Sequence, residues 1–508
     1  MGKKINIEEL ATFCRKKGFV YQNSEIYGGL SGFFDFGPLG VELKNNIKTS
    51  LWKNFVTSRE DVVGLDGSII SKAKIWKASG HVDSFADVTL RCNKCKKIFR
   101  GDHLIEDSLN IPADGISAEE VSNIIKKHKL KCTKCEGNLK TTASFNLMFK
   151  TNIGVIQNNP AYLRPETAQL IFTNFKAVQE NARIKLPFGI AQLGKAFRNE
   201  ISPRDFLFRM REFEQFEIEF FTNSTVKNSC SILKDVQSLK VNILTRKNQK
   251  ENTNHETKSI KQLVDNHIFK EKWQAYWVSL FYNWFLDNGI NPKNLRIREH
   301  LKKELAHYAD SCFDIEYKFP FGWKEIHGNA NRAQFDLKQH MEASKRDLSI
   351  FDTESNTKTV PYVVAEPSQG IERALLAFLF DAYNDDEKRG NIVLKLNPKL
   401  SPIKITIFPL VNKPGIIKLA KEIQNKLKEK YAVFYDKSGS IGRRYARQDE
   451  IGTPICLTID FDSLKNKDVT LRDRDSTSQI RIKIDKLNET IDKFLKGETI
   501  EKLGKIIE

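Results

Sequence analysis

The sequence lacks any long apolar run. No stretch of its 508 residues approaches the roughly 20 apolar residues that a helix needs to cross a bilayer. The opening stretch MGKKINIEELATFCRKKGF has no apolar core of signal-peptide length. We therefore expect a soluble, cytoplasmic protein without membrane contact. A composition of 40% hydrophobic and 29% charged residues is ordinary for a globular chain, and the length allows two or three domains.

Internal repeats, low-complexity linkers and the phosphate-binding pattern GxxxxGK[ST] are also absent, which argues against a P-loop enzyme. Negative charge is in short supply. The 82 lysines and arginines exceed the 64 acidic residues and give a net charge of +18. Such an excess would attract a polyanion such as nucleic acid. The alternative is that a composition rich in Lys, Asn and Ile reflects an AT-biased genome, so charge alone does not identify a partner.

Cysteine is scarce, with eight residues in all, yet four of them stand in the pairs CNKC (Cys92, Cys95) and CTKC (Cys132, Cys135). Such pairs are typical of thiolate ligands for one tetrahedral zinc, because the spacer lets both sulfurs of a turn reach the metal. Four sulfurs would leave no open coordination position, so the zinc would be structural. The alternative is four unrelated buried thiols or a redox pair. The 36 residues between the pairs look like a strand, a loop and a short helix.

Apolar spacing predicts several elements along the chain. Residues 7–17 and 41–56 have the spacing of amphipathic helices. A charged insertion, residues 223–294, contains the aromatic stretch WQAYWVSLFYNWFLDNG, which predicts a packed helix face; stacking on nucleic acid is the alternative. From Pro402 onward, strands alternate with helices, and this predicts a small α/β domain with a largely parallel sheet.

The stretch AFRNEISPRDFLFRMREFEQFEIEFF, residues 196–221, places four arginines among five glutamates in a setting that otherwise reads as apolar strand. We interpret it as a hairpin whose turn is ISPRDF. Because side chains alternate along a strand, Arg198 and Glu200 share one face of the outgoing strand. On the return strand the apolar face consists of Phe216, Ile218 and Phe220. The opposite, mixed face consists of Phe213, Gln215, Glu217 and Glu219.

One explanation of these charges is a solvent-exposed face with ion pairs, each worth ~0–1 kcal/mol. That arrangement would leave the ring of Phe213 in water, so we favour a pocket. An arginine presents a planar fork to phosphate oxygens, an aromatic ring can stack on a base, and a glutamate can hold an ammonium group.

Two further segments combine charged and apolar residues in the same way. YLRPETAQLIF carries Arg164, Glu166, Thr167 and Gln169. VVAEPSQGIERALLAFLF runs from an apolar strand through Glu366, Ser368 and Gly370 into a helix with Arg373 in its first turn. A glycine there would let a ligand approach the backbone, and a helix start offers N–H groups to an anion. A cation in the first turn opposes the helix dipole, so a helix cap alone does not explain Arg373.

These residues resemble a known family. FRNE…FRMREFEQFEIEFF is similar to motif 2, and GIERALLAF to motif 3, of class II aminoacyl-tRNA synthetases. Together with YGGLSGFFDFGPLG, SGHVDSFAD, YLRPETAQ, AEPSQGIERALLAF and VTLRDRDS, they look like the homodimeric form of glycyl-tRNA synthetase. The resemblance covers most of the chain and implies an α+β catalytic core, an antiparallel sheet flanked by helices, followed by an anticodon-binding domain.

On this resemblance the chain divides into six segments. They are 1–90, the first part of the catalytic domain with a motif 1-like region; 91–141, a zinc-binding insertion; 142–222, core with motif 2; 223–294, a charged helical insertion; 295–401, core with motif 3; and 402–508, the anticodon-binding domain.

The resemblance also implies the reaction. Glycine would attack the α-phosphate of ATP, aided by Mg²⁺, to give glycyl-adenylate and pyrophosphate, and the 3′-terminal ribose of tRNA(Gly) would then accept the glycyl group. Catalysis would consist mainly of positioning and charge stabilisation, with Arg198 on the α-phosphate and Arg373 on the γ-phosphate as catalytic residues. Glu200 would hold the adenine amino group, the ring of Phe213 would lie under the adenine, and Glu325 in WKEIHG would stand beside ATP and its magnesium.

Further site residues follow from the same comparison. For ATP they are Arg198, Asn199, Glu200, Phe208, Arg209, Met210, Arg211, Glu212, Phe213, Glu325, Ile326, Gly370, Ile371, Glu372 and Arg373. For the amino acid they are Arg100, Glu166, Phe213, Glu214, Gln215, Phe216, Glu217, Glu366, Pro367, Ser368, Gln369 and Gly370, with Arg332 of NANR as a weaker candidate. Glu166, Glu217 and Glu366 match the family's grip on glycine, and Arg100 suggests that the zinc segment carries a loop over the site.

The sequence departs from the family in two ways. It has no counterpart of the motif 1 proline between Asp61 and Gly80, so a homodimer interface is assigned only loosely to residues 41–56 and the following strand. The CxxC pairs occur in only part of the family, so zinc depends on their spacing.

Two alternatives remain beside glycine activation. The first is a class II synthetase for another amino acid such as proline, serine or threonine. The second is a non-catalytic, nucleic-acid-binding relative, which would be expected to lose Arg198 and Arg373. A class I synthetase is disfavoured because HIGH-type and KMSKS-type sequences are absent.

Overall fold

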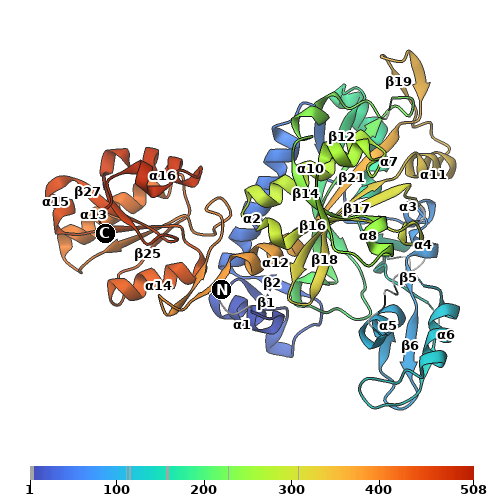
Figure 1. Cartoon of the computed structure of the whole chain (residues 1–508), viewed down its shortest axis with the longest axis horizontal. Helices are drawn as coiled ribbons and strands as arrows, with labels where there is room; N and C mark the ends of the chain where they lie inside the picture. Colours follow the sequence, from blue (N-terminus) through green and yellow to red (C-terminus); the bar gives the residue numbers. More distant parts are fainter. Residues whose placement is uncertain are drawn as a thin grey trace.

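The computed structural model describes residues 5–507, apart from 110, 112, 114–115, 143, 156–159, 227 and 307. A large body is followed by a smaller C-terminal domain, which begins after residue 401 and lies to one side of it (Figure 1). A separate lobe carrying α5, α6 and β6 projects from the large body. Among the described helices, none combines the length and apolar character needed to cross a membrane.

A nine-stranded sheet organises the large body. Its strands, in spatial order, are β15 (Glu256–Ser259), β14 (Lys240–Leu244), β16 (Leu295–Glu299), β17 (Ser311–Phe319), β18 (Gly322–Asn331), β21 (Tyr362–Gly370), β13 (Glu212–Thr222), β12 (Phe188–Phe197) and β3 (Val62–Leu65). All neighbours are antiparallel except β14 with β16 and β12 with β3. The predicted antiparallel core sheet is confirmed.

Helices cover both faces of this sheet. On one face lie α2 (Pro38–Trp52), α10 (Lys272–Asp287) and α12 (Ile371–Ala382), whose apolar side chains share a core with Phe216 and Ile218 of β13. On the other face α7 (Ala168–Ala182) packs against β12 and β13, and α11 (Phe335–Ser344) packs against α7. The predicted helix 41–56 lies within α2 and its π-helical continuation, Lys53–Thr57, and the predicted helix 7–17 is α1 (Ile7–Lys17). Apolar spacing therefore located both helices.

The segment 223–294, predicted to be a charged helical insertion, is part of the large body. Its strands β14 and β15 extend the nine-stranded sheet, and α10 is buried on nearly every side in the main core. Trp273 and Trp277 pack against Phe220 of the motif 2-like hairpin, with ring centres 4.6 and 5.2 Å apart. The aromatic residues of α10 therefore form core, as their spacing predicted.

The lobe between residues 86 and 146 contains β5 (Ala86–Asp87), β6 (Thr89–Cys92), β7 (Ile98–Arg100), α5 (Gly101–Leu109), α6 (Ala118–His128), β8 (Leu139–Thr141) and β9 (Phe145–Asn146). It has a small core of its own around Leu90, Ile105 and Val121. The sequence predicted one short helix here, and the structure adds a second, α5. Residues 110, 112 and 114–115 of this segment lie outside the described residues.

The C-terminal domain is built on a five-stranded sheet, in the order β25 (Val433–Tyr435), β24 (Ile405–Pro409), β26 (Ile455–Ile459), β27 (Asp468–Asp473) and β28 (Gln479–Lys483). Its helices are α13 (Pro414–Leu427), α14 (Ile441–Ile451), α15 (Phe461–Asn466), α16 (Leu487–Leu495) and α17 (Ile500–Leu503). The prediction of a largely parallel sheet was wrong. β24 pairs in parallel with β25 and β26, but β27 is antiparallel to both of its neighbours, β26 and β28. β27 and β28 follow each other as a hairpin, and only the short helix α15 lies between β26 and β27.

The remaining described helices and strands are short. They are β1 (Val20–Gln22), β2 (Phe34–Phe36), β4 (Ile70–Lys72), α3 (Ala73–Ala78), α4 (His81–Ser84), β10 (Lys150–Asn152), β11 (Pro160–Leu163), α8 (Arg246–Lys250), α9 (Ile260–Asp265), β19 (Ile350–Asp352), β20 (Thr357–Thr359), β22 (Tyr383–Asp386) and β23 (Asn391–Leu394).

Candidate active site

Most of the side chains predicted for the site meet in one cavity at the middle of the nine-stranded sheet. The cavity has a volume of about 290 Å³ and is lined by β13, β18, β21, the loop after β12 and the first turn of α12. β13 can form a wall because its side chains alternate: Glu217 faces the cavity, whereas Phe216 and Ile218 point into the core. The predicted apolar face of the return strand is confirmed, and Phe213, Gln215 and Glu217 of its other face line the cavity.

The predicted residues that line the cavity come from five separate segments of the chain. They are Glu166, Arg198, Glu200, Phe208, Arg209, Met210, Phe213, Gln215, Glu217, Glu325, Glu366, Ser368, Gly370, Glu372 and Arg373.

Arg198 and Glu200 reach the cavity from a loop and not from the outgoing strand, which ends at Phe197. The Arg198 guanidinium lies 5.4 Å from the ring centre of Phe213, and its Nε donates a hydrogen bond to the backbone oxygen of Pro165 at 3.1 Å. Residues in a loop do not alternate between two faces as strand residues do. Arg198 and Glu200 therefore both line the cavity because of the loop conformation, which strand periodicity cannot predict.

Glu200 stands between two arginines. Its Oε2 lies 3.4 Å from Nη1 of Arg209 and 3.8 Å from Nη1 of Arg100. Arg100 does not line the cavity. Its guanidinium is held by Asp102 at 2.7 Å and by Asp87 at 3.0 Å, at the end of β7. The lobe therefore touches the site through the carboxylate of Glu200.

Arg373 occupies the first turn of α12 and points back to β18. It pairs with the carboxylate of Glu325 at 3.0 Å, and its Nε and Nη1 donate to the backbone oxygens of Phe208 and Glu325 at 3.3 and 3.2 Å. The guanidinium also lies 4.5 Å from the ring centre of Phe208. Arg198 and Arg373 are thus both oriented by backbone carbonyls and aromatic rings, an arrangement suited to binding an extended anion.

At the other end of the cavity, Glu217 is tightly held. Its Oε2 accepts hydrogen bonds from the backbone N–H of Thr167 at 2.8 Å and from the Thr167 hydroxyl. Its Oε1 accepts from the hydroxyl of Ser368 at 2.8 Å and from the amide of Gln215 at 3.2 Å. Burial and the neighbouring Glu166 raise the pKa of Glu217, while the hydrogen bonds from Thr167 and Ser368 lower it.

Arg332 is the centre of the second carboxylate group and is only 1% exposed. It donates to both oxygens of Asp336 at 2.7 and 2.8 Å and to Glu366 at 2.6 Å, and Glu166 lies 3.9 Å away. The ring of Tyr308 covers its guanidinium at 3.8 Å. Because a buried charge without its partner typically costs 3–5 kcal/mol, these groups form one interdependent cluster.

The carboxyl groups of this cluster differ in their affinity for protons. Burial raises the pKa of Glu366 to about 8; Arg332 opposes this, and Glu217 and Glu166 add to it. Burial acts in the same direction on Glu166, but His81 and Arg332 hold its pKa well below its usual value. The cavity therefore carries less negative charge at neutral pH than its carboxyl count suggests, and an entering cation favours further ionisation.

Some predicted residues lie on the opposite face of β13 or at its end. Glu214 shares a face with the core residue Phe216 and pairs with Lys44 at 3.4 Å and Lys48 at 3.1 Å. Glu212 pairs with Lys195 of β12 at 2.7 Å. Because side chains alternate along β13, its even-numbered residues point away from the cavity. A match to a continuous sequence motif does not distinguish these residues from the odd-numbered ones.

Other predicted residues support the cavity from outside. Arg211 donates to the backbone oxygen of Glu200 at 2.8 and 3.0 Å, and Gln369 donates to the backbone oxygens of Ile326 at 2.8 Å and Gly370 at 2.9 Å. The remaining predicted residues outside the lining are Asn199, Ile326, Pro367 and Ile371, of which Ile326 is a core residue.

Sequence reasoning missed a cluster at the cavity edge, formed by His300, Cys312 and Asp314. His300 Nε2 lies 2.6 Å from Asp314 Oδ2, and Cys312 Sγ lies 3.8 Å from Asp314 Oδ1. β16 and β17 are antiparallel neighbours, so the residue after β16 meets the start of β17. The sequence contained one signal for this cluster, namely polar residues at the ends of two apolar strands that face each other. Other cavity residues that were missed are Leu207, Glu304, Ala306, Tyr308, Ala309, Gly328, Asn329 and Ala330.

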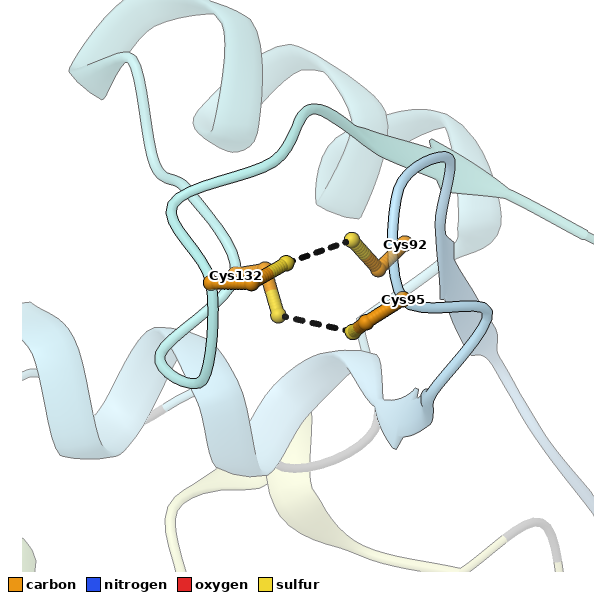
Figure 2. A group of neighbouring side chains, drawn as sticks. Cys92, Cys95 and Cys132 are labelled. Atoms are coloured by element: carbon orange, nitrogen blue, oxygen red, sulfur yellow. Dashed lines mark hydrogen bonds between the residues drawn. The ribbon is translucent and has the colours of Figure 1, made fainter.

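The four paired cysteines converge in the lobe. Figure 2 shows Cys92, Cys95 and Cys132 directed toward one another from facing turns. The Sγ atoms of Cys92 and Cys135 are 3.5 Å apart, those of Cys95 and Cys132 are 3.6 Å apart, and all four lie within 4.8 Å of one another. Tetrahedral zinc with sulfurs at about 2.3 Å requires sulfur separations of about 3.8 Å. The four thiols therefore fit a zinc ion.

Family comparisons agree with this geometry. Residues 149–382 match the profile described as "tRNA synthetase class II core domain (G, H, P, S and T)", which spans motif 2 and motif 3. Residues 404–494 match "Anticodon binding domain". A prolyl-tRNA synthetase from Cryptosporidium parvum, solved with L-proline and AMP, shares the fold over 99% of this chain and 80% of its own, with a TM-score of 0.57 and 13% identity.

Curated relatives match over nearly the full length. The chain is 44% identical over 506 residues to a glycine–tRNA ligase of Caldanaerobacter subterraneus, covering 98% of this chain and 100% of the relative. It is 44% identical to that of Clostridium acetobutylicum, with the same coverage, and 45% identical to that of Acetivibrio thermocellus over 96% of this chain and 98% of the relative. The chain therefore belongs to the glycine–tRNA ligase family, with a class II synthetase core and a C-terminal anticodon-binding domain.

Proposed function

We infer that this chain is a glycine–tRNA ligase, which activates glycine with ATP and transfers the glycyl group to tRNA(Gly). The observation that supports this most directly is the cavity itself. Two oriented arginines, Arg198 and Arg373, stand at one end, and a cluster of buried carboxyl groups around Glu217 and Glu366 stands at the other. Such a cavity suits an anionic nucleotide beside a small ammonium-bearing molecule.

In the activation step, a carboxylate oxygen of glycine forms a bond to the α-phosphorus of ATP. The bond from that phosphorus to the bridging oxygen breaks, and pyrophosphate leaves. We assign Arg198 to the α-phosphate and Arg373 to the γ-phosphate, where fixed guanidinium groups stabilise charge without reorganising. Phe213, beneath the guanidinium of Arg198, supplies an aromatic face for the adenine ring, and Glu200 accepts a hydrogen bond from its amino group.

Glycine has no side chain to hold, so its ammonium group carries its recognition. We assign Glu217 as the main ammonium ligand, because Thr167 and Ser368 fix its two oxygens. Glu166 and Glu366 complete the negative environment. In the transfer step, the 3′-terminal ribose hydroxyl of tRNA attacks the carbonyl carbon of glycyl-adenylate, and AMP leaves.

Two metals fit the residues present. Glu325 and its neighbour Asp314 offer oxygen donors of the kind that Mg²⁺ prefers, at the end of the cavity where Arg373 lies. Mg²⁺ bound with ATP would neutralise phosphate charge there. In the lobe, the four cysteines would hold a structural zinc.

We further propose that the protein is a cytoplasmic homodimer. The part of the molecule proposed to carry the interface is α2 with the strand β3 that follows it. β3 forms one edge of the nine-stranded sheet, and Val41 of α2 is 41% exposed. Sedimentation velocity on the purified chain tests this assignment, and a monomer at micromolar concentration would contradict it.

ATP–pyrophosphate exchange with each amino acid tests the function. Glycine should support exchange and charging of tRNA(Gly). Arg198→Ala and Arg373→Ala should each lower exchange by about 100-fold or more, the loss typical of removing one charge-stabilising donor. Exchange with proline but not glycine would overturn the substrate assignment, and full exchange in Arg198→Ala would overturn the mechanism.

A further inference from the structure

A buried histidine, His81, touches the active-site cavity through one carboxyl group. It is the first residue of α4 and is 9% exposed. Its Nε2 lies 3.3 Å from Oε2 of Glu166, which lines the cavity, whereas His81 itself does not. Any effect of His81 on a bound amino acid must therefore pass through Glu166.

The imidazole ring of His81 is fixed on its other sides. Its Nδ1 lies 2.8 Å from Oγ of Ser79, which is itself buried. The ring packs against Trp76 and Phe85, with ring centres 5.5 Å away in each case. Because an ionised carboxylate can only accept hydrogen bonds, the ring nitrogen that faces Glu166 carries a hydrogen and donates it. A buried hydrogen bond of this kind is stronger than the same bond in water.

Glu166 divides its contacts between its two oxygens. Oε1 accepts a hydrogen bond from the amide of Gln169 at 3.0 Å and lies 3.9 Å from Nη2 of Arg332. Oε2 faces His81. Arg332 lies closer to the two other carboxyl groups of its cluster, at 2.6 and 2.7 Å. His81 therefore makes the more direct contact with Glu166.

The main chain at His81 is held by the base of the cysteine lobe. The side-chain amide of Asn146, in β9, donates to the backbone oxygens of His81 at 3.1 Å and Val82 at 2.9 Å. β9 pairs with β5, which follows α4 after one residue (Figure 1). The position of His81 beside Glu166 is thus set in part by contacts where the lobe joins the large body.

Glu166 differs from the other carboxyl groups assigned to the ammonium group of glycine. Burial raises the pKa of Glu366 to about 8 and also raises the pKa of Glu217. Burial acts in the same direction on Glu166, but His81 and then Arg332 hold the pKa of Glu166 well below its usual value. Among these three groups, Glu166 most readily carries a negative charge before an ammonium group arrives.

We propose that His81 is a positioning residue for the amino acid, and that its Nε2–H orients the carboxylate of Glu166 as a fixed negative partner for the ammonium group of glycine. This rests on the proposed function and adds to the glycine site a residue that does not touch the substrate. The competing role is packing alone, in which His81 only fills the space between Trp76 and Phe85. A packing role depends on the shape of the ring, whereas the proposed role depends on its N–H group.

Glycine-dependent pyrophosphate exchange on the full-length protein separates these roles. His81→Phe keeps a ring and removes the donor, so it should raise the KM for glycine about tenfold at neutral pH, the loss expected for one hydrogen bond to a charged group. The KM for ATP should stay near wild type. His81→Gln places an amide N–H near the position of Nε2 and should recover most of the loss. The matched control is His103→Phe, which replaces an equally buried histidine of α5 outside the cavity lining and should leave the KM for glycine unchanged.

The pH dependence of this KM is a measurement that packing alone would not change. Without the donor, burial and the neighbouring carboxyl groups raise the pKa of Glu166, so it is protonated at low pH and regains its charge as pH rises. The ratio of the KM of His81→Phe to that of wild type should therefore be largest near about pH 6 and smaller near about pH 8. Both proteins share the titration of the other groups that face Glu166, so the ratio removes most of their contribution. These groups are Arg332 after β18, Glu217 of β13, Glu366 of β21 and Tyr308 of the segment before β17.

The outcomes separate the possibilities. An unchanged KM for glycine in His81→Phe would overturn the proposal. So would a KM raised by the same factor at every pH and not recovered in His81→Gln, because that result assigns packing alone to His81. If His81→Phe does not fold, Ser79→Ala decides: it frees the ring to turn and should raise the KM for glycine several-fold, and an unchanged KM there would also overturn the proposal. Absence of glycine-dependent exchange in the unmodified protein would instead contradict the proposed function itself.

Discussion

Glu217 and Glu219 show how much two carboxyl groups on one face of a strand can differ. Glu217 faces the cavity and its oxygens accept hydrogen bonds from Thr167, Ser368 and Gln215. Glu219 is fully buried, and neither of its oxygens has a hydrogen-bond partner among the described residues. Burial and the nearby Glu366 raise the pKa of Glu219 well above its usual value, so the folded protein favours the protonated form.

The raised pKa of Glu219 makes the free energy of unfolding depend on pH. In the unfolded chain this carboxyl group releases its proton above a pKa of about 4.5, whereas the folded protein retains it. The folded state then binds more protons, so the contribution of Glu219 to stability falls as pH rises, by up to about 1.4 kcal/mol per pH unit. We expect Glu219→Gln to flatten the decline of the apparent Tm between pH 5 and pH 8.

The matched change two residues away is the control. Glu217→Gln should raise the KM for glycine in pyrophosphate exchange, because it removes a charged ammonium ligand, whereas Glu219→Gln should leave that KM near wild type. Parallel Tm profiles of wild type and Glu219→Gln from pH 5 to pH 8 would show that Glu219 is ionised when buried.

At the scale of elements, the cysteine lobe and the sheet meet at one side chain. Arg100 ends β7, directly before α5, and lies between Asp87, Asp102 and Glu200. Cys92 lies at the end of the neighbouring strand β6. A short β-hairpin therefore connects the cysteine turns to Arg100, which contacts the loop that borders the cavity.

Loss of zinc should accordingly have a local and a remote effect. We expect Cys132→Ser to bind less than one zinc per chain and to show faster hydrogen exchange in residues 91–141, since a structural zinc contributes directly to folding. The KM for ATP should rise, because Arg100 then no longer steadies Glu200. Zinc analysis and exchange mass spectrometry measure the first two effects.

Cys230→Ser is the control for this experiment, because it removes a buried thiol far along the chain from the cluster. One zinc per chain in Cys132→Ser, with unchanged hydrogen exchange, would exclude the cysteine cluster as the metal site.

Periodicity predicted the faces of β13 correctly because both strands of that hairpin are regular over ten residues. It failed for Arg198 and Glu200, since they follow the last ladder pair and obey loop geometry. It also had no means to find Arg332 as the centre of a carboxylate cluster. That role depends on Asp336, Glu366 and Glu166, which come from three different segments.

At the scale of the molecule, the junction of body and C-terminal domain rests on polar contacts from the β22–β23 hairpin. Arg389 donates to the backbone oxygens of Arg474 at 2.7 Å and Asp475 at 2.6 Å, and lies 3.4 Å from Asp449. Asn46 of α2 donates to the backbone oxygens of residues 400 and 401. These bonds contribute to the position of the anticodon-binding domain, together with the bond from Arg474 to the backbone oxygen of Leu396 at 2.8 Å.

Removing Arg389 should loosen this junction without touching the cavity. We expect Arg389→Ala to raise the KM for tRNA several-fold and to increase the radius of gyration in small-angle scattering, because hydrogen bonds to charged groups contribute about 1.5–3 kcal/mol each. Glycine-dependent exchange should be unchanged. Lys388→Ala, an exposed neighbour in the same turn, is the control.

A radius of gyration and a tRNA KM identical to wild type in Arg389→Ala would show that other contacts hold the domain.

The division into a large body and a C-terminal domain could be predicted from the change in the pattern of strands and helices near residue 402, because apolar spacing depends only on residues close in sequence. Apolar spacing could not predict the mixed sheet of the C-terminal domain or the placement of residues 223–294 in the main sheet. Both depend on which strands become neighbours, and strand pairing joins residues that are distant in sequence.

The burial of β13 on both faces has a consequence for how this chain can change over time. From Glu214 to Thr222 each residue is buried, against helices on one side and against the cavity or α7 on the other. In this stretch of nine residues, the substitutions that can be tolerated are those that keep side-chain volume and polarity. Exchange of its charges would require compensating substitutions in α2, α12 and β21 together.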